Sequence, residues 1–116
     1  MYIHSKRVYT SDGVKDAIIN VEDNKIKEIL DFNPDIKIDV DYENNRIIPG
    51  IIDTHNHGTM GYTLMGDDDI EFNVRGYLKG LASQGVTGIF ATAEPNYFKT
   101  INKISKEEVF GAKVLG

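Results

Sequence analysis

Cysteine is absent from this chain of 116 residues, which excludes disulfide bonds and thiolate metal ligands. No apolar run approaches the roughly 18 residues of a membrane-spanning helix, and the N-terminus lacks the apolar core of a signal peptide. The formal net charge is -5, and the largest basic cluster is the pair Lys6-Arg7. These absences argue against nucleic-acid and membrane partners. We therefore expect a cytoplasmic protein in which histidine and carboxylate groups would hold any metal.

The first part of the chain has the pattern of short strands. Segments 2–10, 14–21 and 25–30 are separated by turn sequences at 11–13 and 22–24. Ile36, Ile38 and Val40 then alternate with charged residues, as in a strand with one buried face. The sequence thus predicts a small β layer with one solvated face.

The pattern changes after residue 46. Segment 47–55 is largely apolar on both faces, as expected of a fully buried strand. A helix over 70–81 is predicted by apolar residues at i, i+4, i+7, i+8 and i+11, namely Ile70, Val74, Tyr77, Leu78 and Leu81. Segments 86–93 and 112–115 read as further strands, and 95–110 as a weaker helical stretch. This order predicts an α/β class with a parallel sheet or barrel.

His55 and His57 are the main candidates for chemistry. Two residues apart on a strand, they project from the same face, so one metal ion could reach both imidazoles. Asp53 shares that face and could accept an imidazole N–H or bond nearby backbone, so we expect a supporting role. The alternative is that the pair consists of two polar loop residues unrelated to metal. His4 lies on a predicted strand of the β layer, where we expect a structural role.

Residues 49–58 resemble the Pro-Gly-x-x-Asp-x-His-x-His signature of the amidohydrolase superfamily, with Gly58 directly after the pair. Together with 85–87 and the closing Gly-Ala-Lys-Val-Leu-Gly at 111–116, the segment resembles the N-acetylglucosamine-6-phosphate deacetylase family. The resemblance implies residues 1–46 as part of a β-sandwich. It implies 47–116 as the first strands and helices of a (β/α)8 TIM barrel, which would be truncated here.

The resemblance also implies a reaction, metal-dependent deacetylation of N-acetylglucosamine 6-phosphate to glucosamine 6-phosphate and acetate. His55 and His57 would bind a divalent ion such as zinc or iron, with Asp53 and Gly58 in support. In that family the general acid/base and a Glu ligand follow the position of Gly116, so we expect no catalytic residue in this chain. We accordingly expect weak or absent metal binding and no turnover by the isolated 116 residues.

Other interpretations remain open. Dihydroorotases and dihydropyrimidinases share the His-x-His strand, although Gly58 and the closing segment favour the deacetylase. A non-catalytic β/α module that retains the His pair as a relic belongs to a different functional class. An incomplete barrel would also leave a sheet edge and an apolar face uncovered, so we expect a homo-oligomer.

Overall fold

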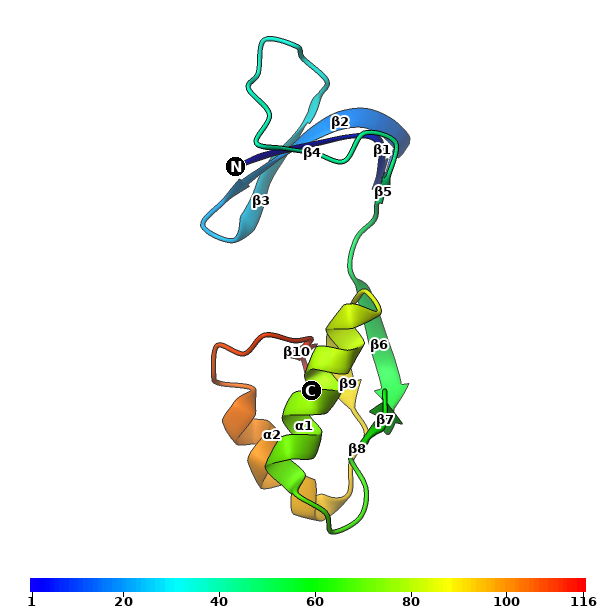
Figure 1. The fold of residues 1–116 in the computed structure, drawn as a ribbon, viewed down its shortest axis with the longest axis vertical. Coiled ribbons are helices and arrows are strands. Elements are labelled where there is room, and N and C mark those ends of the chain that lie inside the picture. Colours follow the sequence, from blue (N-terminus) through cyan, green and yellow to red (C-terminus); the bar gives the residue numbers. More distant parts are fainter. The chain divides into compact units, whose positions relative to one another are not determined.

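The computed structural model describes all of residues 1–116, and the chain divides into two compact units, Met1–Pro49 and Gly50–Gly116 (Figure 1). We expected the boundary between residues 46 and 47. In the structure Ile47 belongs to the first unit, because it pairs with Val8 in that unit's sheet.

The first unit is a single sheet. Its strands are β1 (Tyr2–Thr10), β2 (Gly13–Glu22), β3 (Lys25–Asp31), β4 (Val40–Asp41) and β5 (Arg46–Ile47). The order is β3-β2-β1-β4, and β5 also pairs with β1. The first three strands are antiparallel, whereas β4 and β5 run parallel to β1. Val8, Ala17 and Ile19 form its small buried apolar cluster.

Local chemistry explains the turns of this unit. Asp23 and Asn24 both have positive φ, 50° and 59°, in the tight connection between β2 and β3. Asn and Asp tolerate this conformation better than most residues, which is why such residues mark turns.

The predicted strand at residues 36–40 is largely wrong. Ile36, Ile38 and Val40 are half-buried while Lys37 and Asp39 are exposed, so the alternation in burial is real. Only Val40 enters a ladder, in β4. A period of two therefore reports which side chains face inward, whereas a strand also needs a neighbour for its backbone groups.

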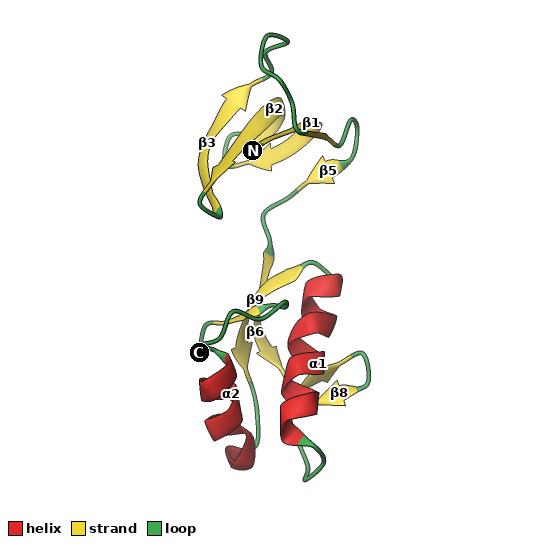
Figure 2. Cartoon of the chain, turned by 60° about the vertical axis from the view of Figure 1, so that its left-hand side comes forward, coloured by secondary structure: helices red, strands yellow, loops and turns green.

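The second unit combines a parallel sheet, a hairpin and two helices (Figure 2). Its strands are β6 (Ile51–Asn56), β7 (Gly58–Thr59), β8 (Tyr62–Thr63), β9 (Val86–Ala91) and β10 (Lys113–Val114). Its helices are α1 (Ile70–Ser83), the 3-10 turn η1 (Pro95–Tyr97) and α2 (Phe98–Ile104). β6, β9 and β10 pair in parallel in the order β10-β9-β6, and β7 pairs with β8 in an antiparallel hairpin.

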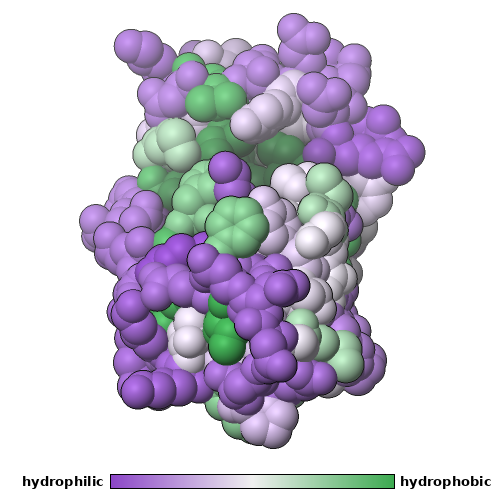
Figure 3. Space-filling model, turned by 60° about the horizontal axis from the view of Figure 1, so that its bottom comes forward, coloured by the Kyte–Doolittle hydropathy of each residue, from purple (hydrophilic) through white to green (hydrophobic).

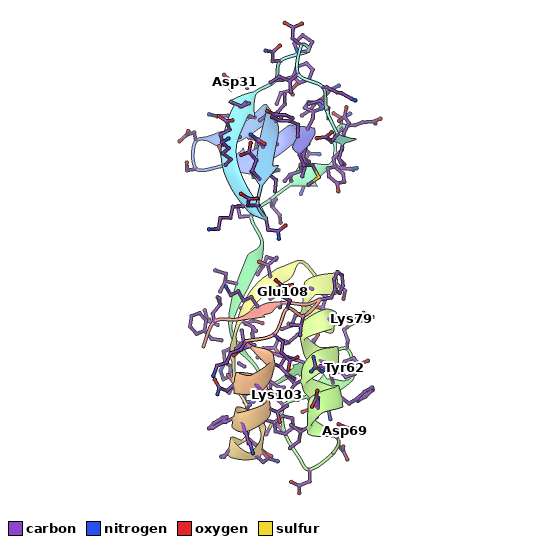
Figure 4. All side chains as sticks on the ribbon, turned by 90° about the vertical axis from the view of Figure 1, so that its left-hand side faces the viewer. Asp31, Tyr62, Asp69, Lys79, Lys103 and Glu108 are labelled. Atoms are coloured by element: carbon purple, nitrogen blue, oxygen red, sulfur yellow. The ribbon has the colours of Figure 1, made fainter.

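Helix α1 begins and ends at residues suited to those positions. The Asp69 side chain caps its N-terminus by accepting the Phe72 backbone N–H at 3.0 Å, and Glu71 adds negative charge to the first turn. Figure 4 shows Asp69 at this end of the helix. Gly85, with φ of 82°, follows the C-terminus. Neither helix is long and apolar enough to cross a membrane.

The helices bury one face of the parallel sheet. The buried cluster joins residues of α1, β9, η1, α2 and the preceding loops: Leu64, Val74, Tyr77, Leu78, Leu81, Ile89, Tyr97, Ile104 and Ala112. Full burial of one such aliphatic or aromatic side chain contributes about 1.5–3 kcal/mol. This cluster stabilises α1 despite its two interior glycines.

The opposite face of this sheet is exposed. Ile52, Phe90 and Leu115 remain 57%, 44% and 44% exposed. Apolar surface of this kind is visible as green areas among the hydrophilic side chains in Figure 3. The prediction that segment 47–55 is buried on both faces is therefore wrong for this strand.

The predicted fold class, an N-terminal β-sandwich part followed by the first β/α units of a truncated TIM barrel, is also wrong in its barrel, because no β/α repeats of a TIM barrel are present. Strands contain 41% of the residues and helices 21%, in small mixed sheets with only two α-helices. The stretch 95–110 forms one 3-10 turn and the seven-residue α2, and β10 has only two residues. Periodicity indicates the type of each element, but barrel closure requires many strands of matched tilt and stagger, which no local pattern specifies.

Candidate metal centre

The two candidate ligands lie side by side in the structure. His55 is the penultimate residue of β6, and His57 is in the bend that follows the strand. Their ring centres are 4.9 Å apart, with the ring planes at 90°. Both side chains are exposed, so a dissolved ion can reach them.

This spacing fits two ligands of one ion. With zinc–nitrogen bonds of about 2.0–2.1 Å and tetrahedral angles, two imidazoles place their ring centres roughly 5 Å apart. The donor type also fits, since neutral imidazole binds zinc, iron and related metals well. No group of three or more His, Asp or Glu side chains arranged for a metal occurs in the chain. The residues present therefore fit as a two-ligand part of a centre.

Thr92 contacts one of the two rings. Its Oγ1 lies 3.0 Å from His55 Nδ1, a hydrogen-bonding distance. Thr92 directly follows β9, and its backbone N–H donates to the Asn56 carbonyl oxygen at 3.3 Å. The neighbouring strand thus brings a hydroxyl group against the imidazole.

Asn56, between the two histidines, is held at three of its polar groups. Its Nδ2 donates to Asp53 Oδ2 at 3.0 Å, and its Oδ1 accepts the Gly58 backbone N–H at 2.9 Å. Its carbonyl oxygen accepts from the Tyr77 hydroxyl and from the Thr92 N–H, both at 3.3 Å. Because these bonds fix the backbone on both sides of Asn56, they define where the flanking imidazoles project.

Asp53 supports the backbone of this segment. Its Oδ1 accepts the His55 backbone N–H at 3.1 Å, and its Oδ2 accepts from Asn56. Of the two roles considered from sequence, the structure therefore places Asp53 on nearby backbone and an amide, with no bond to an imidazole. The His55 N–H, then the Asn56 amide, lower the pKa of the Asp53 carboxyl below its usual value.

Gly58 lies where a side chain would not fit. It pairs with Thr63 across the β7–β8 hairpin. A Cβ at this position would be 2.5 Å from the Tyr62 carbonyl oxygen and 3.2 Å from Thr63 Cα. Strand β8 therefore lies close to the backbone directly after His57, and glycine allows this close approach.

Tyr77 supports the site from the helix side. Its ring is buried in the apolar core against which α1 packs, while its hydroxyl donates a hydrogen bond to the Asn56 carbonyl oxygen. Burial, then the charge of Asp53, raises the pKa of the Tyr77 phenol to about 12. The sequence pattern indicates Tyr77 only as a residue of the apolar helix stripe, because helical spacing does not report what a hydroxyl contacts.

Thr92 and Glu94, which follow β9, have different roles. Residues 92–94 follow β9, which is parallel to β6, and so lie at the same end of the sheet as the His pair, where Thr92 contacts His55. Glu94 instead accepts the Gly66 backbone N–H at 2.8 Å through Oε2, so its carboxylate holds a neighbouring loop. Only the first residue of this segment thus joins the candidate centre.

No known family model and no curated protein sequence matches this chain.

Proposed function

We propose that this chain carries metal ligands for deacetylation of N-acetylglucosamine 6-phosphate to glucosamine 6-phosphate and acetate. The observation that supports this best is the placement of the His55 and His57 rings, 4.9 Å apart at the end of a parallel strand. The sequence resemblance described above supplies the substrate and the reaction. The geometry supports the more general step, the binding of a divalent metal by an imidazole pair.

Each residue of the candidate centre has a distinct task in this proposal. His55 and His57 hold the ion, Asp53 and Asn56 fix the backbone between them, and Gly58 admits the adjacent hairpin. When bound, a divalent ion would polarise an amide carbonyl and lower the pKa of its bound water to about 7. We assign no general acid or base to a residue of this chain.

Two ligands set the expected strength of binding. A catalytic zinc site normally has three protein ligands and an open position. We therefore propose that the 116-residue chain binds zinc, iron(II) or cobalt(II) weakly, and that turnover requires at least one further donor. A non-catalytic module with a relic His pair is the main competitor, and it would show no specific metal uptake.

Metal titration separates these two possibilities. Isothermal titration with zinc, and the visible absorption of cobalt(II), should show one weak site in the wild-type chain. His55→Ala and His57→Ala should each lose it, whereas Lys99→Ala, an exposed change on α2, should not. Equal uptake by wild type and both His variants would refute the proposed centre.

An activity assay tests the substrate. We expect acetate release by the chain alone to be slow or absent with zinc, cobalt(II) or iron(II), since only two ligands are assigned. Any measurable turnover should require the 6-phosphate sugar and both histidines. Hydrolysis of dihydroorotate or dihydropyrimidines in place of the sugar phosphate would favour those alternative enzymes.

We also propose that copies of the chain associate with one another in the cytoplasm. The exposed apolar side chains Ile52, Phe90 and Leu115 support association, and Phe110 is 86% exposed. Size-exclusion chromatography with light scattering should give a mass above 13.0 kDa. A monomer at micromolar concentration would refute the association.

A further inference from the structure

We infer that Thr92 is a positioning residue that keeps the His55 imidazole protonated on Nδ1, so that Nε2 presents the lone pair a metal needs. This inference rests on the proposed function for its purpose. The tautomer itself is a property of the metal-free chain and can be measured there.

The contact is built between two strands. β6 pairs with β9 through Asn56 and Ala91, and Thr92 directly follows the second strand. The Thr92 N–H donates to the Asn56 carbonyl, which ties its backbone to the residue adjacent to His55. The 3.0 Å distance between Thr92 Oγ1 and His55 Nδ1 therefore joins two groups whose main chains are already fixed.

The chemistry gives this contact a direction. A neutral imidazole has one N–H and one lone pair, and a threonine hydroxyl can donate or accept. If the hydroxyl accepts from Nδ1–H, Nε2 carries the lone pair and can bind a metal. If the hydroxyl donates, the lone pair is used at Nδ1 and Nε2 carries the proton. Metal-binding histidines usually donate their other N–H to a nearby acceptor, which favours the first arrangement here.

The sequence around the contact offers matched variants. Thr92→Val keeps the shape of the side chain and removes the hydroxyl acceptor, whereas Thr92→Ser keeps the hydroxyl. Thr54→Val makes the same isosteric change at an exposed residue of β6 and serves as the control. Circular dichroism of each variant checks that the fold is retained.

The first measurement is the tautomer of His55. Two-bond nitrogen–proton NMR spectra of the metal-free chain at about pH 8.5, where ordinary imidazoles are neutral, distinguish Nδ1–H from Nε2–H. We expect Nδ1–H in wild type, in Thr92→Ser and in Thr54→Val, and a shift toward Nε2–H in Thr92→Val. An Nε2–H wild type, or identical tautomers in wild type and Thr92→Val, would overturn the inference.

The second measurement is zinc affinity. Loss of a hydrogen-bond partner of a metal-binding histidine typically weakens affinity 10- to 100-fold, so Thr92→Val should bind zinc that much more weakly, with Thr92→Ser near wild type. Where the wild type binds zinc, equal affinity of Thr92→Val and wild type would overturn the inference. A tautomer change in Thr92→Val together with no zinc binding by wild type would support the role of Thr92 and refute the proposed function.

Discussion

His4 and Asp41 are hydrogen bonded across the parallel pairing of β1 with β4, with 2.8 Å between His4 Nδ1 and Asp41 Oδ1. The other ring nitrogen, Nε2, lies 2.9 Å from Asp16 Oδ1 on β2. The His4 residue is only 4% exposed, and its ring centre is 4.6 Å from that of Phe32. Because ionised carboxylates only accept hydrogen bonds, the ring satisfies both partners when it carries two protons. His4 is thus structural, as we expected from its strand position.

This arrangement predicts that the first unit loses stability as the pH rises above about 6.5. Burial alone lowers the His4 pKa, but hydrogen bonds and charge from Asp16 and Asp41 outweigh it and raise the pKa above 6.5. A group whose pKa is higher in the folded state than in the unfolded state contributes its full stability below the unfolded-state pKa. That contribution is lost as the pH rises through the folded-state pKa. Urea unfolding followed between pH 5 and pH 9 should show this decline.

Asp41 sets the acidic limit of the pH range in which the first unit is most stable. The Glu43 backbone N–H, then His4, lower the Asp41 pKa below 3.8, so its contribution is present above that pH and is lost on acidification. These groups together are expected to stabilise the unit most between about pH 4 and pH 6.5. His4→Gln should flatten the decline on the alkaline side, and an unchanged slope in this variant would contradict the assignment.

Tyr77→Phe should lower the free energy of unfolding of the second unit by about 0.5–1.5 kcal/mol, the usual net contribution of one hydrogen bond. The reason is loss of the bond from its hydroxyl to the Asn56 carbonyl, which retains only the Thr92 N–H. Chemical denaturation measures the change, and zinc titration should show weaker binding. Unchanged stability and affinity would show that the hydroxyl does not support the site.

Alkaline titration provides a separate test of Tyr77. Because burial raises the Tyr77 pKa from 10.0 to about 12, the folded chain should lose stability as the pH rises from about 10 through 12. Phenolate absorbance near the end of the titration should include this late-ionising tyrosine. Tyr77→Phe should reduce that late component and leave the contribution of Tyr97, whose phenol pKa is also raised by burial. A late component of unchanged size would contradict the assignment.

Gly58→Ala should destabilise the second unit by about 1–3 kcal/mol, the usual cost of an overpacked methyl group. The new Cβ would lie 2.5 Å from the Tyr62 carbonyl oxygen, so the hairpin or the His57 backbone must shift. Zinc binding should weaken along with stability. Thermal unfolding and titration measure the two effects.

Gly80→Ala is the matched control for that change. Its Cβ would meet the exposed Met60 side chain and Thr59 Cγ2 at 3.2 Å, which side-chain adjustment can relieve. Alanine also gains about 1 kcal/mol of helix propensity over glycine. Stability near wild type is therefore expected, and an equal loss in both variants would exclude a specific role for Gly58.

Leu81→Ala should cost about 2–5 kcal/mol, because it removes a buried side chain from the core beneath α1. Arg75→Ala on the same helix should change stability little, although Arg75 pairs with Glu71 and Glu107 at 2.7 and 2.8 Å. These ion pairs are solvent-exposed and screened. Urea unfolding of both variants compares them, and a larger effect of Arg75→Ala would contradict this ranking.

Much of the local structure could be predicted from particular residues. The segments at 2–10, 14–21 and 25–30, separated by turn sequences, form β1, β2 and β3, and the stripe beginning at Ile70 forms α1. These predictions succeeded because turn residues and side-chain period act within a few residues of one another. The segment 36–40 failed because its backbone lacks a ladder partner over most of its length.

The candidate site shows the same division. The spacing of His55 and His57 predicted neighbouring imidazoles, and the structure has their rings 4.9 Å apart; metal binding by them stays a prediction. The position of Thr92 after the next parallel strand follows from sequence, but its contact with His55 does not, and Tyr77 could not be assigned to the site at all. Each residue reaches the site from another element, more than 20 residues along the chain. Their hydroxyl contacts depend on how the strands and α1 pack.

The amino-acid sequence by itself determined the first three strands, helix α1, the turns between the strands and the local imidazole pair, since these follow from periodicity and short-range backbone preferences. Tertiary structure alone decided that the sheets stay small and mixed, that Ile52 is exposed, and that Asp53 serves the backbone. The physical reason is that burial and hydrogen-bond partners are assigned when separate elements pack together, and several packings are compatible with one local pattern.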